Sequence, residues 1–262
     1  MRRTSTTALG LTLASVGLLL LAACAPTGEP GTADSPTPTA IASQTPAGVP
    51  AVSSPRECDD VDLIADATVT GDALSACVIA YSRAAGSGHL HLQSADLTGE
   101  ADFVFGDAPA TSGSVAGSDG THDFVLTSDE AWVGFDGAWV RADATSSDYR
   151  AVIAATIGET YRAFADPSAA AALLAAAPGW TVQPDQDTVS LPDGTEVRAW
   201  RVHANGSFSA SGVDVKDMTV WLGEGHRVVA IQETGSFGGI ETTTVQQFTG
   251  WGEPVKIEVP KG

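Results

Sequence analysis

Residues 131–142 read AWVGFDGAWVRA, and this stretch decides the fold class. Apolar and aromatic residues flank the dipeptide Asp136-Gly137 on both sides. Both positions of such a dipeptide tolerate the positive φ angles that a two-residue hairpin turn requires. The sequence therefore predicts strands over 131–135 and 138–142, and strands joined by a tight turn run antiparallel.

The same kind of pattern extends outward from this hairpin on both sides. Before it, apolar segments predict strands over 89–94, 102–105 and 122–127. After it, we expect strands over 181–182, 188–191, 196–203, 215–222, 227–234, 240–248 and 256–259, with tight turns at Asp193-Gly194 and Glu224-Gly225.

Two helical regions interrupt the strands. The first covers 72–85, where apolar residues recur at helical spacing, Asp72 can cap the helix and Gly86 ends it. The second is rich in alanine and covers 148–177, with a fresh start at Pro167. The order helix, meander, helices, meander predicts an α+β fold: one curved antiparallel half-barrel sheet with helices packed on its concave face.

The first 55 residues predict export and a lipid anchor. Two arginines precede an uncharged apolar run that is too short for a membrane span. The run ends in Leu21-Ala22-Ala23-Cys24, which is the pattern of a bacterial lipobox. We therefore expect a signal peptide over 1–23, an acylated Cys24, a disordered tether over 24–55 and one folded domain over 56–262. The alternative is an ordinary signal peptide with an incidental cysteine.

Charge narrows the classes of partner. Without its first 23 residues the chain has 11 lysines and arginines against 32 acidic residues, a net charge of −21. Such a surface repels nucleic acid and anionic headgroups. We therefore expect the acyl chain at Cys24, and no basic patch, to hold the protein on a membrane.

The two remaining cysteines, Cys58 and Cys77, form an even set in an exported chain, which favours a disulfide between them. Two free buried thiols are the alternative. The chain has no C-x-x-C motif, so nothing in it indicates redox catalysis.

The tail carries Thr242-Thr243-Thr244-Val245, Phe248, Gly252, Pro254, Val255, Ile257 and Pro260. This tail resembles the closing strands of the LolA-like superfamily, and the closer likeness is to the LppX/LprA/LprF/LprG family of actinobacterial lipoproteins. The hairpin from Trp132 to Trp139 and the strand over 218–222 match the order of elements in that family. The resemblance implies an open half-barrel plugged by helices, with an apolar cavity between the two that carries lipid or a lipidated glycan.

Residues that would line such a cavity are the apolar members of the alternating or helical sets. They are Leu74, Val78, Leu90, Leu92, Phe103, Phe105, Phe124, Leu126, Leu173, Leu174, Met218, Val220 and Leu222. The same residues would form an ordinary core in a closed fold. The alanine-rich helical region leaves the choice open, because small side chains can leave room for acyl chains or let the helix sit close against the sheet.

No catalytic constellation is present in the sequence. The motifs G-x-S-x-G, S-x-x-K and H-E-x-x-H and the P-loop are all absent, so we expect no enzyme and no cofactor. On a strand, His89 and His91 share one face and could hold a metal ion, with His122 and Asp123 as further ligands if their strand is a neighbour. The simpler interpretation, which we favour, is that both histidines face solvent.

Three functions are compatible with these features. The first is a lipid-anchored monomer at the extracytoplasmic face of the plasma membrane that binds or carries lipid or glycolipid. The second is a non-catalytic tethered module with a closed core, whose acidic surface binds a membrane protein or wall polymer. The third is a metal-binding surface protein that uses His89 and His91.

The lipobox yields a direct test. Replacing the thiol in Cys24→Ala should abolish incorporation of a fatty-acid analogue, because the thiol is the acylated group, and should leave the chain uncleaved or released to the medium. Unchanged labelling of the variant would contradict the assignment.

Overall fold

The structure is a computed structural model that describes residues 52–118, 120–165, 167–210, 212–237 and 240–261. The expected signal peptide, Cys24 and most of the expected tether lie outside the described residues. By its internal contacts the chain divides into residues 1–46 and a compact unit, 47–262, to which all the following observations belong.

The unit is built from one large sheet and three α-helices. The helices are α1 (Gly71–Ala85), α2 (Tyr149–Ala165) and α3 (Pro167–Ala176), with short 3-10 turns η1 (Arg56–Cys58) and η2 (Glu224–His226). The strands are β1 (Thr68–Val69), β2 (Ser87–Gln93), β3 (Thr98–Val104), β4 (Ala110–Gly117), β5 (Gly120–Thr127), β6 (Ala131–Phe135), β7 (Ala138–Arg141), β8 (Trp180–Ser190), β9 (Glu196–Ala204), β10 (Phe208–Ala210), β11 (Val213–Leu222), β12 (Val228–Phe237) and β13 (Ile240–Thr249).

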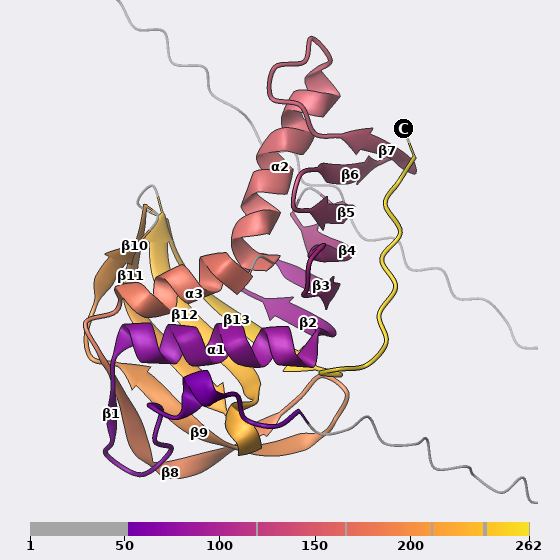
Figure 1. Cartoon of the computed structure of the whole chain (residues 1–262). Helices are drawn as coiled ribbons and strands as arrows, with labels where there is room; N and C mark the ends of the chain where they lie inside the picture. The colour runs from indigo at the N-terminus through magenta and orange to yellow at the C-terminus, as the bar shows by residue number, and fades with distance from the viewer. Residues whose placement is uncertain (1–51, 119, 166, 211, 238–239, 262) are drawn as a thin grey trace, which may run out of the picture. The chain divides into compact units, whose positions relative to one another are not determined.

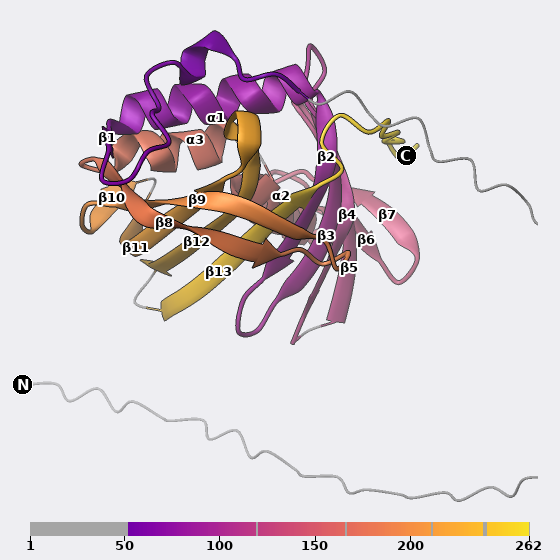
Figure 2. The ribbon, with the colours of Figure 1, turned by 90° about the horizontal axis from the view of Figure 1, so that it is seen from below.

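The sheet has the order β1-β8-β9-β11-β12-β13-β2-β3-β4-β5-β6-β7, with β10 paired to β11, and every pairing is antiparallel. It is open, with β1 and β7 at its ends. Figures 1 and 2 show it curving around the three helices, with α1 and α3 over the half that contains β9 to β13 and α2 over β5 to β7. The expected α+β fold with an open antiparallel sheet is therefore confirmed.

The local signals explain much of this order. Asp136 and Gly137 both have positive φ, 53° and 78°, as the β6–β7 turn requires. Gly86 ends α1 in the left-handed conformation, as expected. The expected cap is wrong: the Thr70 hydroxyl accepts the amide of Ala73, and Asp72 lies in the first turn.

Three expectations about strands are also wrong. Strand β4 was missed because it is made of small residues, and its Gly113 lies so close to β3 that a Cβ there would be 2.7 Å from Cα of Ala101. The two short strands expected over 181–191 are one strand, β8, with a bulge between Val182 and Gln186. Residues 256–259 form no strand, because β12 and β2 already occupy both edges of β13.

The core consists of two main clusters. One lies between α1, α3 and the strands β8 to β12, and the other covers the concave face of β2 to β6. Trp180 is fully buried in the first cluster, and its indole N–H donates to the carbonyl of Leu174 at 3.1 Å. Helices α1 and α3 pack closely, since a Cβ on Gly71 would lie 2.7 Å from the carbonyl oxygen of Ala175.

The expected disulfide is present between Cys58 and Cys77. Both residues are buried, and the bond joins η1 to the middle of α1 across 19 positions of sequence. It fixes the incoming chain on the outer side of the first core cluster.

We expect the double variant Cys58→Ser/Cys77→Ser to lose about 3 kcal/mol of unfolding free energy, as the chain-entropy model gives for a loop of this length. Urea unfolding monitored by tryptophan fluorescence measures the change. The parent protein unfolded with and without reductant is the control, and thiol counting on the denatured, unreduced parent should find no free thiol among Cys58 and Cys77.

Candidate functional site

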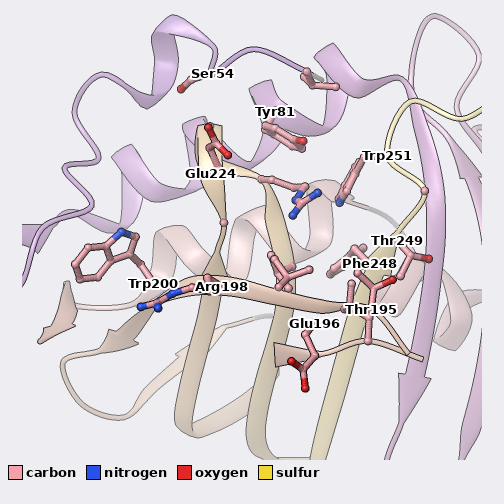
Figure 3. A pocket seen from close by; sticks show the side chains of 18 of the residues that line it. Ser54, Tyr81, Thr195, Glu196, Arg198, Trp200, Glu224, Phe248, Thr249 and Trp251 are labelled. Carbon is pink, nitrogen blue, oxygen red and sulfur yellow. The ribbon is translucent and has the colours of Figure 1, made fainter. Parts of the chain in front are cut away.

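A pocket of about 1090 Å³ lies beneath α1, where the ends of β9, β12 and β13 meet (Figure 3). Its walls come from five parts of the chain. They are 52–54 with Leu63, Tyr81 of α1, Gln186 with the β8–β9 tip and β9 (Leu191, Asp193, Thr195, Glu196, Val197, Arg198, Trp200), η2 with its flanking residues and the start of β12 (Gly223, Glu224, Gly225, Arg227, Val229), and the end of β13 with the turn after it (Phe248, Thr249, Gly250, Trp251, Glu253).

The β8–β9 hairpin forms one side of the pocket because it bends across the neighbouring strands. The bulge in β8 changes its course, and the side-chain amide of Gln247 on β13 donates to the carbonyl of Ser190 at 2.8 Å. Below the hairpin, Val197 and Ala199 pack against Val229 in a third small buried cluster. These contacts hold the hairpin tip in place.

Trp251 is the centre of the aromatic wall. Its indole N–H donates to the carbonyl of Val228 at 2.8 Å. Its ring meets Tyr81 edge-on at 5.4 Å between centroids, stacks on Phe248 at 5.7 Å and contacts Phe103 at 5.2 Å. Phe248 and Trp251 also pack against both main core clusters, and Phe248 pairs with Leu90 across the β13–β2 ladder, so the pocket adjoins the concave face of the sheet.

Charge is distributed unevenly over the pocket. Asp193, Glu196, Glu224 and Glu253 are all exposed, whereas Arg227 is half-buried. Burial raises the pKa of the Tyr81 hydroxyl, and the positive charge of Arg227 opposes that shift. Exposed Arg198 donates from Nε to the side-chain carbonyl of Gln186 at 3.1 Å.

The apolar residues expected to bind lipid are all placed in the core. Leu74, Val78, Leu174, Met218, Val220 and Leu222 belong to the first cluster, with Leu173 packed against it. Leu90, Phe103, Phe124 and Leu126 belong to the second, with Phe105 packed against it, and Leu92 is buried beside them. The gap left between this part of the sheet and Tyr161 of α2 measures about 20 Å³, roughly the room for one water. That these residues bind lipid stays a prediction, and none of them lines the large pocket.

The sequence analysis did not identify the residues of the large pocket, because no regular spacing along the chain links them. Phe248 did stand out as the end of a closing strand, but Thr249, Gly250 and Trp251 were not singled out. A tryptophan between two glycines just after a strand was the available signal: Gly250 and Gly252 both have positive φ and turn Trp251 back onto Val228.

The histidines alternate with buried leucines, as expected of a strand. Nδ1 of His89 lies 2.5 Å from the carboxylate of Asp102, and Nδ1 of His91 lies 3.7 Å from that of Glu100. Strand β5, which carries His122, is separated from β2 by β3 and β4, so the suggested third ligand is not a neighbour. Within the described residues, the cluster with metal-binding side chains is Cys58, Cys77 and His226, and its two sulfurs form the disulfide.

Among known proteins, solved structures similar to this chain are found. No protein-family model matches the chain, and no curated protein matches it. The structure of LprF from Mycobacterium bovis aligns with 14% identity and a TM-score of 0.48, over 73% of this chain and 97% of that one. A LolA superfamily protein from Nitrosomonas europaea aligns with 8% identity and a TM-score of 0.18, over 63% and 83% of the two chains.

Both matches carry the names that the sequence resemblance indicated. The TM-scores are below 0.5, so the architecture rests on the strands and helices described above and no function is transferred from either protein. Within the described residues, no helix has the length and apolarity needed to cross a membrane.

A carboxyl lies on the concave face of the sheet beside the first core cluster. Glu233 on β12 is paired with Met218 on β11 and Thr244 on β13, so it shares the face of the first core cluster. Burial raises its pKa above the ordinary value. A raised carboxyl pKa means that the folded state favours the protonated form, so this group contributes stability at low pH and loses that contribution as pH rises through its folded-state pKa.

We therefore expect Glu233→Gln to raise the unfolding free energy at pH 7 and to lose this advantage below pH 4, where the parent carboxyl is protonated in both states. Urea unfolding at several pH values measures the difference. Glu159→Gln, on the exposed side of α2, removes the same charge and should show no such pH-dependent gain. A gain independent of pH would refute burial as the cause.

Proposed function

We propose that this chain is a membrane-anchored lipoprotein that binds lipid or glycolipid at the extracytoplasmic face of the plasma membrane. The lipobox at Cys24 supports the anchor and the location. The large aromatic-walled pocket supports the binding activity, and it is the observation that carries the proposal.

The pocket has the size and composition that an amphiphile needs. Ligand pockets of proteins measure about 300–1,000 Å³, and this one, at about 1090 Å³, is slightly larger than that range. Trp251, Phe248 and Tyr81 supply apolar surface, and each acyl methylene buried there gains about 0.8 kcal/mol. Polar groups at the rim can remain in contact with the headgroup and with water.

A second candidate function is the tethered interaction module. The observation that favours it is the close packing between α2 and the strands β2 to β5, where the remaining gap measures about 20 Å³, because this function requires no lipid cavity in that part of the core. Its acidic surface would then be the binding surface.

The test uses the full chain with Cys24→Ser, which removes the anchor. We expect lipid in an organic extract of the gently purified protein and uptake of a fluorescent fatty acid at micromolar concentration. Thr195→Trp places a bulky ring in the pocket wall from an exposed position and should weaken uptake at least several-fold. Thr188→Trp, exposed on β8 of the same hairpin but outside the pocket, is the matched control and should not.

Ala170→Trp on α3 tests the other location. If this variant alone weakens uptake, the ligand lies beside α3 among the residues first expected from the sequence, and not in the pocket beneath Tyr81 of α1. A folded protein that carries no lipid and takes up no probe would leave the interaction module as the function.

A further inference from the structure

Arg227 is a charged residue whose side chain lines the pocket. Its side chain is half-buried, and within the described residues its guanidinium makes no hydrogen bond or ion pair. A guanidinium is always charged and carries five N–H donors. Donors withdrawn from water without partners are costly, so a half-buried arginine that faces a pocket is suited to a ligand that accepts hydrogen bonds.

The backbone around Arg227 is fixed, although its side chain is unpaired. Its amide donates to the carbonyl of Glu224 at 3.3 Å, and its carbonyl accepts the amide of Gly223 at 2.8 Å. The next residue, Val228, accepts the indole N–H of Trp251. The backbone of Arg227 is therefore tied to the aromatic wall, and Figure 3 shows Tyr81, Trp251 and Glu224 at the pocket that Arg227 also lines.

The acidic residues of the pocket limit what can reach Arg227. Asp193, Glu196, Glu224 and Glu253 are exposed at the rim. The Asp193 carboxylate accepts the amide of Thr195, and that bond lowers its pKa, so it is ionised at neutral pH. These carboxylates repel a ligand with several negative charges. A ligand with one negative charge on an apolar body meets less repulsion as it enters, and its charge is attracted by the guanidinium of Arg227.

Resting on the proposed function, we propose that the pocket selects amphiphiles with a single anionic group, a carboxylate or a phosphodiester. The anionic group accepts hydrogen bonds from Arg227, and the apolar body lies against Trp251 and Phe248. Arg227 is the specificity-determining residue.

The experiment compares a pyrene-labelled fatty acid with its methyl ester, which has the same apolar body and no charge. In the full chain with Cys24→Ser, the acid should bind roughly ten-fold or more tightly than the ester, as expected for a charge-assisted hydrogen bond. Arg227→Gln should reduce binding of the acid to that of the ester and leave the ester unchanged. Arg201→Gln, whose parent guanidinium lies 3.6 Å from Asp187 outside the pocket, removes the same charge and should change neither.

The outcomes separate the two proposals. Equal binding of acid and ester, or equal weakening of both by Arg227→Gln, overturns the anionic selectivity and leaves lipid binding intact. Binding of neither probe overturns both. Acetate and inorganic phosphate are added as competitors: failure of both to displace the acid at millimolar concentration supports an amphiphile, and displacement by either shows a small free anion as the ligand and overturns the proposal.

Discussion

The ladder between β13 and β2 is the interaction on which the rest of the structure depends. Five residue pairs, from Val245 with Gln93 to Thr249 with His89, join the last strand of the chain to the first strand of its N-terminal meander. Without this ladder the chain would form two separate sheets, each with an exposed edge. With it, the helices between the two meanders are enclosed by one continuous curved surface.

The same ladder positions the pocket. It brings Phe248 opposite Leu90, so the aromatic wall continues the concave face of β2. The chain then turns at Gly250 and Gly252, and the amide of Gly252 donates to the carbonyl of Ser87 at the start of β2. Trp251 is consequently held between the two core clusters, and the tail after it has no free strand edge to join.

The alanine-rich helical region resolves a choice that the sequence left open. In α3, Leu174 is fully buried and Ala171 nearly so, and α3 approaches α1 closely at Gly71. Small side chains here bring the helices together and close the interior, which is why the expected lipid-binding residues form a packed core.

The sequence predicts those features of the fold that are specified by residues close together in the chain. Turn dipeptides, the glycine that ends α1 and the fresh start at Pro167 act within a few residues, and the fold class, the helices and most strands follow from them. Strand β4 gave no such signal, because its small residues are required by the close approach of its neighbour at Ala101. The disulfide was predicted only from the even number of cysteines that remain after Cys24. The pocket depends on a bulge in β8 and on a turn about 65 residues later in the chain, and no periodicity links those positions.

The charge of the body and the charge inside the pocket act over different distances. At physiological salt the field of the exposed carboxylates is screened within about 8 Å, so the body's large negative charge affects a ligand only close to the rim. Arg227 is half-buried, so screening at its guanidinium is weaker and a single charge there interacts more strongly. If the chain is anchored by an acyl group as proposed, it would need no basic surface in order to receive an anionic amphiphile. On the same proposal, the exposed carboxylates would discriminate between headgroups by their number of charges, and Arg227 would discriminate between charged and neutral ones.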